Sequence, residues 1–314
     1  MKKTNAITDV PGIEVGHAQD EDALTGCTVI LCRKGAVAGV DVRGGAPGTR
    51  ETDLLNPINL VEKLHAVVLA GGSAFGLDSA TGVMRYLEEQ KIGLQTGAAR
   101  VPIVSAAILY DLSLGRADVR PDAAMGYQAA RSASSSRPAE GNVGAGTGAS
   151  VGKIRGMQYA MKSGLGTCSI NINGVIVGAL VAANPVGDVV DPRDGTVIAG
   201  LRSGATLAWM KKNAAQPPVR SNTVIGVIAT NARLTKAGAT KIAQMAQDGL
   251  ARAIRPAHTM FDGDTIFTLA TGAQKADVSM VGSFAAEVMA EAIVRAVKMA
   301  APAAGLQGLF RSNP

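Results

Sequence analysis

The chain has 314 residues, of which 47% are hydrophobic and 18% charged, a balance typical of a compact globular protein and not of a disordered one. The N-terminus lacks the apolar core of a signal peptide, and no stretch of about 18 apolar residues lacks charged or turn residues. We therefore expect a cytoplasmic protein without a membrane span. The net charge is +6, but Lys and Arg are scattered and aromatic residues make up only 3%, which argues against nucleic-acid binding.

The N-terminal part is predicted to contain strands first and helices later. A turn is expected over residues 11–17, followed by strands and apolar segments at 25–32, 36–43, 66–69 and 103–112. Helices are predicted from residue 76 or 77 to 90 and over 122–132. Cys27 and Cys32 fall in a predicted strand and are interpreted as small core residues.

The middle of the chain is predicted to be loops around one hairpin. Residues 133–152 are rich in Ser, Gly and Ala, which by composition indicates a loop or linker. The dipeptide Asn173-Gly174 joins two alternating segments, 166–172 and 175–182, and is the strongest hairpin signal in the chain. Residues 191–222 lose periodicity and are expected to form an exposed excursion.

The C-terminal part is predicted to alternate strands and helices. Thr223 opens a strongly β-prone strand, and an amphipathic helix over 235–253 follows with Thr235 as its cap. A strand over 266–271 and a closing helix over 284–300 complete the chain. Because the order lacks strict βαβ alternation, the sequence favours a layered α+β fold over a doubly wound one.

Two glycine-rich segments fail the tests for nucleotide binding. In the segment from Gly71 to Gly76, Ser73 stands where a dinucleotide fingerprint needs glycine. A Walker motif needs Ser or Thr after Gly-Lys, whereas Ile154 follows Lys153. We interpret the first segment as a close-packed turn between a strand and a helix. Local sequence alone would make Lys153 a surface residue.

Asp262 and Asp264 are two carboxylates separated by one glycine. They could bind a hard cation, orient a base or shape an Asx turn, and local sequence favours the turn. The three histidines are far apart and share no motif with a cysteine, so no zinc site is expected.

The junction Asn222-Thr223 is the most informative feature. It places a hydroxyl residue at the first position of a core strand, directly after the excursion. If this bond is cut, Thr223 carries both a hydroxyl and an α-amine whose reference pKa is about 7.7. A Thr hydroxyl activated by its own terminal amine is a recognised nucleophile.

The chain resembles the self-cleaving β-aminopeptidase and nylon-oligomer endohydrolase family of N-terminal-nucleophile hydrolases. The resemblance runs from about Asp9 to Lys298, in the family's order. It rests on these motifs: Ile108-Leu109-Tyr110-Asp111-Leu112, Gly144-Ala145-Gly146 through Gly152-Lys153, Asn184-Pro185-Val186-Gly187, Asn222-Thr223 before the strand, and Asp262-Gly263-Asp264-Thr265.

The resemblance implies one hydrolase domain over residues 1–314, cut into an α chain of 1–222 and a β chain of 223–314. Its fold would be a four-layer α/β/β/α sandwich. It also implies a homotetramer of αβ units, without metal or organic cofactor.

The resemblance further implies a role for each matching residue. Thr223 would be the nucleophile and, through its α-amine, the base. Asp262 and Asp264 would orient Thr223 and hold its amine, and Asn184 would donate its side-chain amide to the oxyanion. Two polar-pocket residues complete the set, Tyr110 and Lys153, of which Lys153 would also assist self-cleavage.

The expected substrate is a short oligoamide or peptide. The paired aspartates and the threonine nucleophile resemble the nylon-hydrolase branch, because the classical aminopeptidase branch has Ser and Glu at the aspartate positions and a Gly-Ser junction. The loop before the junction, with Trp209 and Gln-Pro-Pro, departs from that branch. The alternatives are a β-aminopeptidase or D-aminopeptidase that releases N-terminal residues, and a non-catalytic anion-binding protein.

Overall fold

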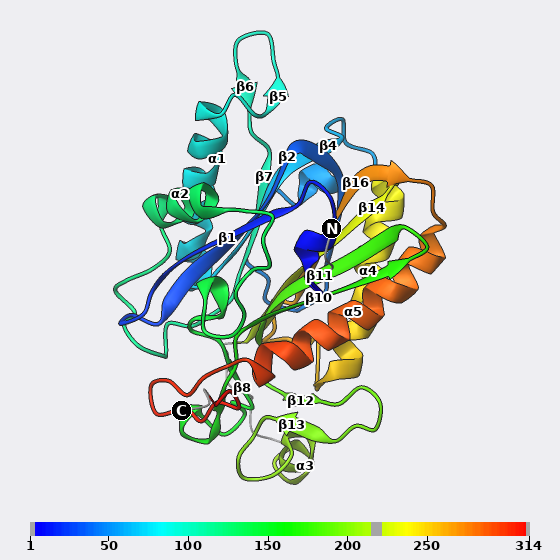
Figure 1. Cartoon of the computed structure of the whole chain (residues 1–314). Helices are drawn as coiled ribbons and strands as arrows, with labels where there is room; N and C mark the ends of the chain where they lie inside the picture. The colour runs from blue at the N-terminus through cyan, green and yellow to red at the C-terminus, as the bar shows by residue number, and fades with distance from the viewer. Residues whose placement is uncertain (1–3, 215–221, 312–314) are drawn as a thin grey trace.

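The computed structural model describes residues 4–214 and 222–311 (Figure 1). Nine strands form one hydrogen-bonded sheet in the order β10-β11-β14-β16-β2-β4-β7-β3, with β1 paired to β2. The strands are β1 (Glu14–Asp20), β2 (Thr25–Val42), β3 (Thr49–Arg50), β4 (Lys63–Ala70), β7 (Val104–Ile108), β10 (Leu165–Ile172), β11 (Val175–Asn184), β14 (Thr223–Ala232) and β16 (Thr265–Gln274).

The long strand β2 connects two halves of this sheet. Its C-terminal part pairs with β16, from Val37 to Val42, whereas its N-terminal part pairs with β4, from Cys27 to Leu31. The pairing with β4 shifts register after Leu31 and continues at Ala36 and Val37. One apolar core is filled by β11, β14 and β16 from one half and by β4 and β7 from the other. The sheet is therefore folded into two facing layers.

Helices cover the outer face of each half. On one side α4 (Lys236–Ala253) contacts β2 and β16, and α5 (Val278–Lys298) contacts β10 and β11. On the other side α1 (Ser79–Glu89) and α2 (Ala123–Ser132) pack over β1, β2, β4 and β7. Separate apolar clusters lie under each helix pair. The predicted α/β/β/α sandwich is confirmed, with its two β layers hydrogen-bonded to each other through β2.

Shorter elements decorate the ends of the sandwich. The remaining strands and α-helix are β5 (Leu94–Gln95), β6 (Arg100–Val101), β8 (Ser150–Val151), β9 (Met161–Lys162), β12 (Asp188–Val190), β13 (Val197–Ala199), α3 (Thr206–Lys212) and β15 (Ile254–Arg255). The 3-10 helices are Ile7–Asp9, Asp53–Leu55, Ser73–Asp78, Gly144–Gly146 and Met157–Tyr159. No helix among the described residues is long and apolar enough to span a bilayer.

Local sequence signals located several elements correctly. Asn173 and Gly174 form the β10–β11 turn with φ of 49° and 94°, the left-handed conformation that these residues tolerate. Thr235 caps α4, and its side chain accepts a hydrogen bond from the Gly238 amide. Cys27 and Cys32 are buried and free, as expected for core residues.

Other boundaries were predicted wrongly. Strand β1 begins at Glu14, inside the predicted turn, and α5 begins at Val278 because Asp277 caps it there. The segment 133–152 is no linker, since Gly144 to Gly152 are buried against the strands. The excursion is only partly exposed, because the buried carboxylate of Asp188 accepts hydrogen bonds from the Leu201 amide and from the amide and hydroxyl of Thr206. Residues 215–221 lie outside the described part.

Candidate active site

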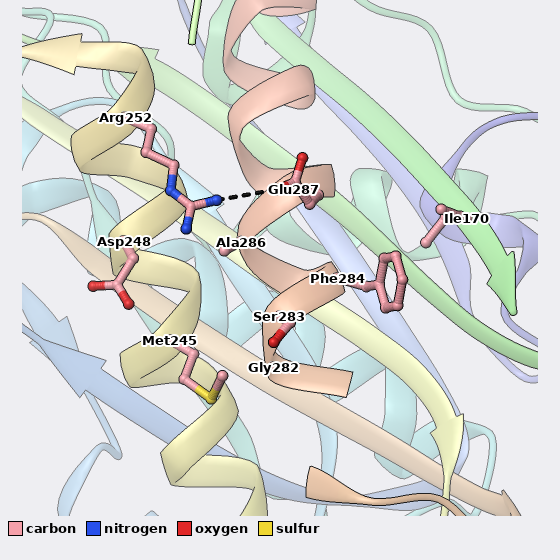
Figure 2. Close-up of a pocket in the computed structure, with 9 residues that line it drawn as sticks. All are labelled: Ile170, Met245, Asp248, Arg252, Gly282, Ser283, Phe284, Ala286 and Glu287. Carbon is pink, nitrogen blue, oxygen red and sulfur yellow. Dashed lines mark hydrogen bonds and ion pairs between the residues drawn. The ribbon is translucent and has the colours of Figure 1, made fainter. Parts of the chain in front are cut away.

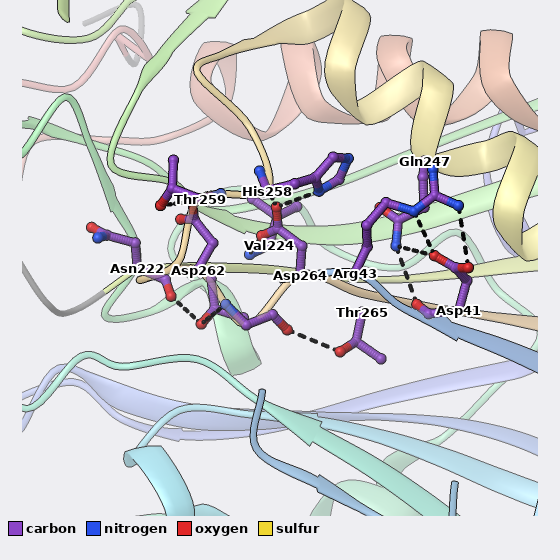
Figure 3. A network of polar contacts seen from close by, with 12 residues as sticks. Asp41, Arg43, Asn222, Val224, Gln247, His258, Thr259, Asp262, Asp264 and Thr265 are labelled. Carbon is purple, nitrogen blue, oxygen red and sulfur yellow. Dashed lines mark hydrogen bonds and ion pairs between the residues drawn. The ribbon is translucent and has the colours of Figure 1, made fainter. Parts of the chain in front are cut away.

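Three strand ends bring the junction and its expected partners together. Thr223, the first residue of β14, lies opposite Asn184, the last residue of β11. Strand β16 begins at Thr265 beside β14, and Asn222 forms a parallel bridge with Asp262 (Figure 3). Residues far apart in sequence thus meet at one edge of the sheet, where strand register fixes their positions.

The Thr223 side chain is held against the peptide bond that precedes it. Its hydroxyl donates a hydrogen bond to the Asn222 carbonyl oxygen and accepts one from the Gly263 amide at 3.2 Å. Thr223 is only 3% exposed. The hydroxyl therefore lies beside the carbonyl group that it would attack in self-cleavage, and the Gly263 N–H donates to the hydroxyl oxygen.

Asp264 fixes the backbone directly after Thr223. Its Oδ1 accepts a hydrogen bond from the Val224 amide at 2.8 Å. Its Oδ2 accepts two, from the His258 amide at 3.1 Å and from His258 Nδ1 at 2.9 Å. The carboxylate is buried. Through these hydrogen bonds it connects the loop before β16 to the first residues of β14 (Figure 3).

Asp262 shapes the turn and also carries a perturbed charge. Its Oδ2 accepts hydrogen bonds from the Thr259 amide at 2.8 Å and the Thr259 hydroxyl at 2.5 Å. An Asx turn would use the amide two residues after the aspartate, whereas Thr259 lies three residues before it, so the Asx-turn interpretation is not confirmed. Burial, and next the neighbouring Asp264, raise the pKa of Asp262 to about 6. This carboxyl group therefore gains or loses its proton at a pH just below neutral.

Asn184 links the nucleophile's partner strand to two further expected residues. Its Oδ1 accepts hydrogen bonds from Lys153 Nζ at 2.6 Å and from the Ser150 amide at 3.0 Å. Its Nδ2 donates one to the Tyr110 carbonyl oxygen at 3.0 Å. Tyr110 thus contributes its backbone to this network, and one of the two N–H bonds of the Asn184 amide is used to orient the side chain.

Lys153 is buried, so the surface interpretation of its local sequence was wrong. It is 1% exposed, and its Nζ also donates to the Asn184 carbonyl oxygen at 3.0 Å. Burial lowers the pKa of Lys153 to about 7, against the opposing influence of Asp262 and Asp111. A substantial fraction of this amine is therefore neutral near pH 7.

Asp111 holds the glycine-rich turn after β4 in place. Its carboxylate accepts hydrogen bonds from the Gly72 amide and the Thr25 hydroxyl, both at 2.7 Å. A Cβ on Gly71 would lie 2.0 Å from Asp111 Oδ2, so only glycine fits there. The close-packing interpretation of this turn is correct, and the pKa of Asp111 is raised by burial.

Lys162 plays a comparable part under the loop that carries Lys153. Its buried amine donates to the carbonyl oxygens of Gly146, Ala149 and Ser163 at 3.1, 2.9 and 2.5 Å. Burial lowers the pKa of Lys162 to about 7. Of the two interpretations of this composition, a loop or a linker, the loop is correct, and the buried amine of Lys162 holds it in place.

Sequence reasoning missed four residues around the expected ones: Ser150, His258, Thr259 and Gly263. Gly263 had a readable signal, because a glycine between two aspartates at a strand start allows close approach of the backbone. A Cβ there would lie 2.9 Å from Thr223 Oγ1. His258 gave no motif, since its contact with Asp264 depends on a loop conformation.

Among residues 4–214 and 222–311, no group of three or more His, Cys, Asp or Glu side chains could hold a metal ion. A cavity of about 410 Å³ lies on the outer surface of α4 and α5, beside an ion pair of 3.0 Å between Arg252 and Glu287 (Figure 2). None of the candidate active-site residues lines it.

Comparison with known proteins identifies the family. The model of peptidase family S58 matches residues 5–311. An uncharacterized aminopeptidase of Mycobacterium leprae is 43% identical over 352 residues, which cover 96% of this chain and 92% of the relative. A 6-aminohexanoate-oligomer endohydrolase of Paenarthrobacter ureafaciens is 34% identical and covers 92% of this chain and 85% of its own.

Solved structures agree. A beta-aminopeptidase of a Burkholderia species superposes with a TM-score of 0.71 at 26% identity, over 98% of this chain and 91% of its own. The L-aminopeptidase D-Ala-esterase/amidase of Ochrobactrum anthropi, described as a variant of the Ntn-hydrolase fold, gives a TM-score of 0.70 at 20% identity, over 94% and 86%. The chain therefore belongs to peptidase family S58 and is a hydrolase with the Ntn-hydrolase fold.

Proposed function

We propose that the chain cuts itself between Asn222 and Thr223 and then uses Thr223 to hydrolyse amide bonds of short oligoamides or peptides. The observation that carries this proposal is the position of the Thr223 hydroxyl, which lies against the Asn222 carbonyl group and receives the Gly263 N–H. The hydroxyl oxygen thus lies next to the carbonyl group that it would attack, which supports the proposal.

In self-cleavage, Thr223 Oγ1 attacks the carbonyl carbon of Asn222 and loses its proton to a base. The C–N bond breaks, the nitrogen of Thr223 takes a proton, and an ester joins Asn222 to the hydroxyl. Water then hydrolyses this ester, which leaves a carboxylate on Asn222 and a free α-amine on Thr223.

Lys153 is the base that we propose for this first step. The nitrogen of Thr223 is an amide before the cut and cannot serve as a base. The Lys153 amine is hydrogen-bonded to Asn184, which lies opposite Thr223 in the strand register. Because burial lowers its pKa to about 7, part of this amine is neutral near pH 7 and can accept the proton of the Thr223 hydroxyl.

In the mature enzyme the α-amine of Thr223 takes over as base. Its reference pKa of about 7.7 leaves it partly neutral near pH 7. Thr223 Oγ1 attacks the substrate carbonyl, the amine passes the proton to the leaving nitrogen, and water releases the acyl group. Asp264, together with Asp262, positions the start of β14, and the second N–H of Asn184 Nδ2 faces the oxyanion.

The buried position of the site restricts the substrate to a small or extended molecule. Thr223, Asn184, Asp262 and Asp264 are each at most 3% exposed in the uncut chain. The acyl part of a substrate must occupy the place of Asn222 once the cut has released it. We propose a 6-aminohexanoate-type oligoamide or a short peptide, in keeping with the endohydrolase and aminopeptidase relatives.

Release of N-terminal residues is the second candidate, favoured by the higher identity of the relatives that are called aminopeptidases. Free and N-acetylated 6-aminohexanoate trimers, together with amino-acid p-nitroanilides, separate the two activities. An endohydrolase cuts both trimers, whereas an aminopeptidase requires the free amine. Failure of wild-type protein to cut any of these amides, with Thr223→Ala as the blank, would contradict the proposed activity.

We also propose that the αβ units assemble as a homotetramer in the cytoplasm, without metal or organic cofactor. Sedimentation of the processed protein measures this assembly. A mass of four αβ units is expected, and a single unit at micromolar concentration would contradict the proposal.

A further inference from the structure

We infer that His258 is a positioning residue for Thr223, acting through Asp264. This inference rests on the proposed self-cleavage and names a further residue on which it depends. His258 lies in the loop between β15 and β16, on the far side of Asp264 from the nucleophile strand (Figure 3).

The contact between His258 and Asp264 is double. The backbone amide and ring Nδ1 of His258 both donate to Oδ2, at 3.1 and 2.9 Å. The other oxygen, Oδ1, receives the Val224 amide at 2.8 Å. The Asp264 side chain has little freedom to rotate, because His258 donates two hydrogen bonds to Oδ2 and the Val224 amide of β14 donates one to Oδ1.

The backbone of His258 adopts an uncommon conformation that allows both hydrogen bonds to Asp264. Its φ is 56°, in the left-handed region, which non-glycine residues enter at a cost of about 1 kcal/mol or more. The conformation turns the amide and the ring towards the same carboxylate. Within the described part of the chain His258 Nε2 has no hydrogen-bond partner, so the ring's polar contact is the one with Asp264.

The two hydrogen bonds from His258 to Asp264 matter most after the bond between Asn222 and Thr223 is cleaved. Before cleavage, the bridge between Asn222 and Asp262 also holds the start of β14. Cleavage makes Thr223 the first residue of the β chain and separates it from Asn222, so the bridge no longer holds it. The contact from Asp264 to the Val224 amide then lies one residue from the free end, and it holds the hydroxyl and the amine of Thr223 in place only if Asp264 itself is fixed.

A matched pair of variants tests the inference. His258→Gly keeps the left-handed backbone and removes the ring donor. His258→Asn keeps both, because asparagine tolerates this conformation and its side-chain amide reaches a position close to that of Nδ1. The rates of β-chain appearance and of 6-aminohexanoate trimer hydrolysis are measured, together with kcat, KM and the melting temperature.

We expect the glycine variant to lose about 30-fold or more in kcat, with KM changed less than about threefold, as a misplaced nucleophile predicts. The asparagine variant should retain more than about a tenth of wild-type kcat. Wild-type kcat in His258→Gly would overturn the inference. So would a folded His258→Asn with less than a tenth of wild-type kcat, which decides the matter even if the glycine variant does not fold.

The two proposals fail in different ways. If the wild-type chain stays uncut, or if Thr223→Ala is still cut, the proposed function is wrong whatever His258 does. If the wild-type chain behaves as proposed and His258→Gly matches it, only the inference about His258 is wrong.

Discussion

A methyl group on Gly263 would collide with the nucleophile. In Gly263→Ala the new Cβ would lie 2.9 Å from Thr223 Oγ1 and 2.8 Å from the Ala46 carbonyl oxygen, distances that real Cβ atoms do not show. Because one neighbour is backbone, either the loop or the hydroxyl must move. Overpacking of this kind costs about 1–3 kcal/mol, and a nucleophile displaced by about 1 Å reacts on the order of 100-fold more slowly.

The assay follows conversion of freshly synthesised 314-residue chain into two fragments on a denaturing gel. Gly97→Ala is the matched control, because a Cβ there meets no atom within 4 Å. We expect the Gly97 variant to cleave like the wild type and the Gly263 variant to cleave about 100-fold more slowly. Wild-type cleavage and melting temperature in Gly263→Ala would refute the placement of Gly263 against Thr223.

Three further predictions concern the buried lysines. Lys153→Met removes the proposed base and a donor to Asn184, so self-cleavage should slow at least about 100-fold. Lys153→Arg should not restore the rate, because arginine stays protonated. Cleavage of Lys153→Met at the wild-type rate would rule out this base. Self-cleavage of the wild type should slow towards tenfold per unit below pH 7, because Lys153 becomes protonated below its pKa of about 7, and more steeply below pH 6, where Asp262 is protonated as well. A rate that is flat from pH 5 to 7 would contradict this assignment. For Lys162 the folded pKa of about 7 lies below its ordinary value of 10.5, so the unfolded chain binds more protons between these values and stability rises with pH. In the uncut Thr223→Ala background, urea unfolding should show a gain from pH 7 to 9 that is roughly 2 kcal/mol smaller in Lys162→Met, and equal gains would show that this amine is not buried in its neutral form.

Local sequence predicted those features that short segments determine. The Asn173-Gly174 turn and the Thr235 cap follow from the conformations and hydrogen bonds of single residues, and both lie where expected. The strand that Thr223 opens was also placed correctly, since its β-branched run is continuous. The layered fold followed from element order together with family resemblance.

Tertiary contacts decide the features that were missed. Lys153 looked like a surface lysine because its partner Asn184 lies on a different strand. The start of α5 was placed too late because its first turn includes small and polar residues, and Asp277 as a cap outweighed them. His258 could not be read from the sequence at all, since its importance arises from a left-handed loop that brings it to Asp264.

The central claim is that the bond between Asn222 and Thr223 breaks through the Thr223 hydroxyl. Intact-mass measurement with N-terminal sequencing of the purified protein tests it most directly. The account predicts that the 31.9 kDa chain of wild-type protein gives two fragments, the smaller beginning at Thr223, while Thr223→Ala remains one chain. Wild-type protein that keeps its full mass after long incubation, or a fragment that begins at any other residue, would contradict it.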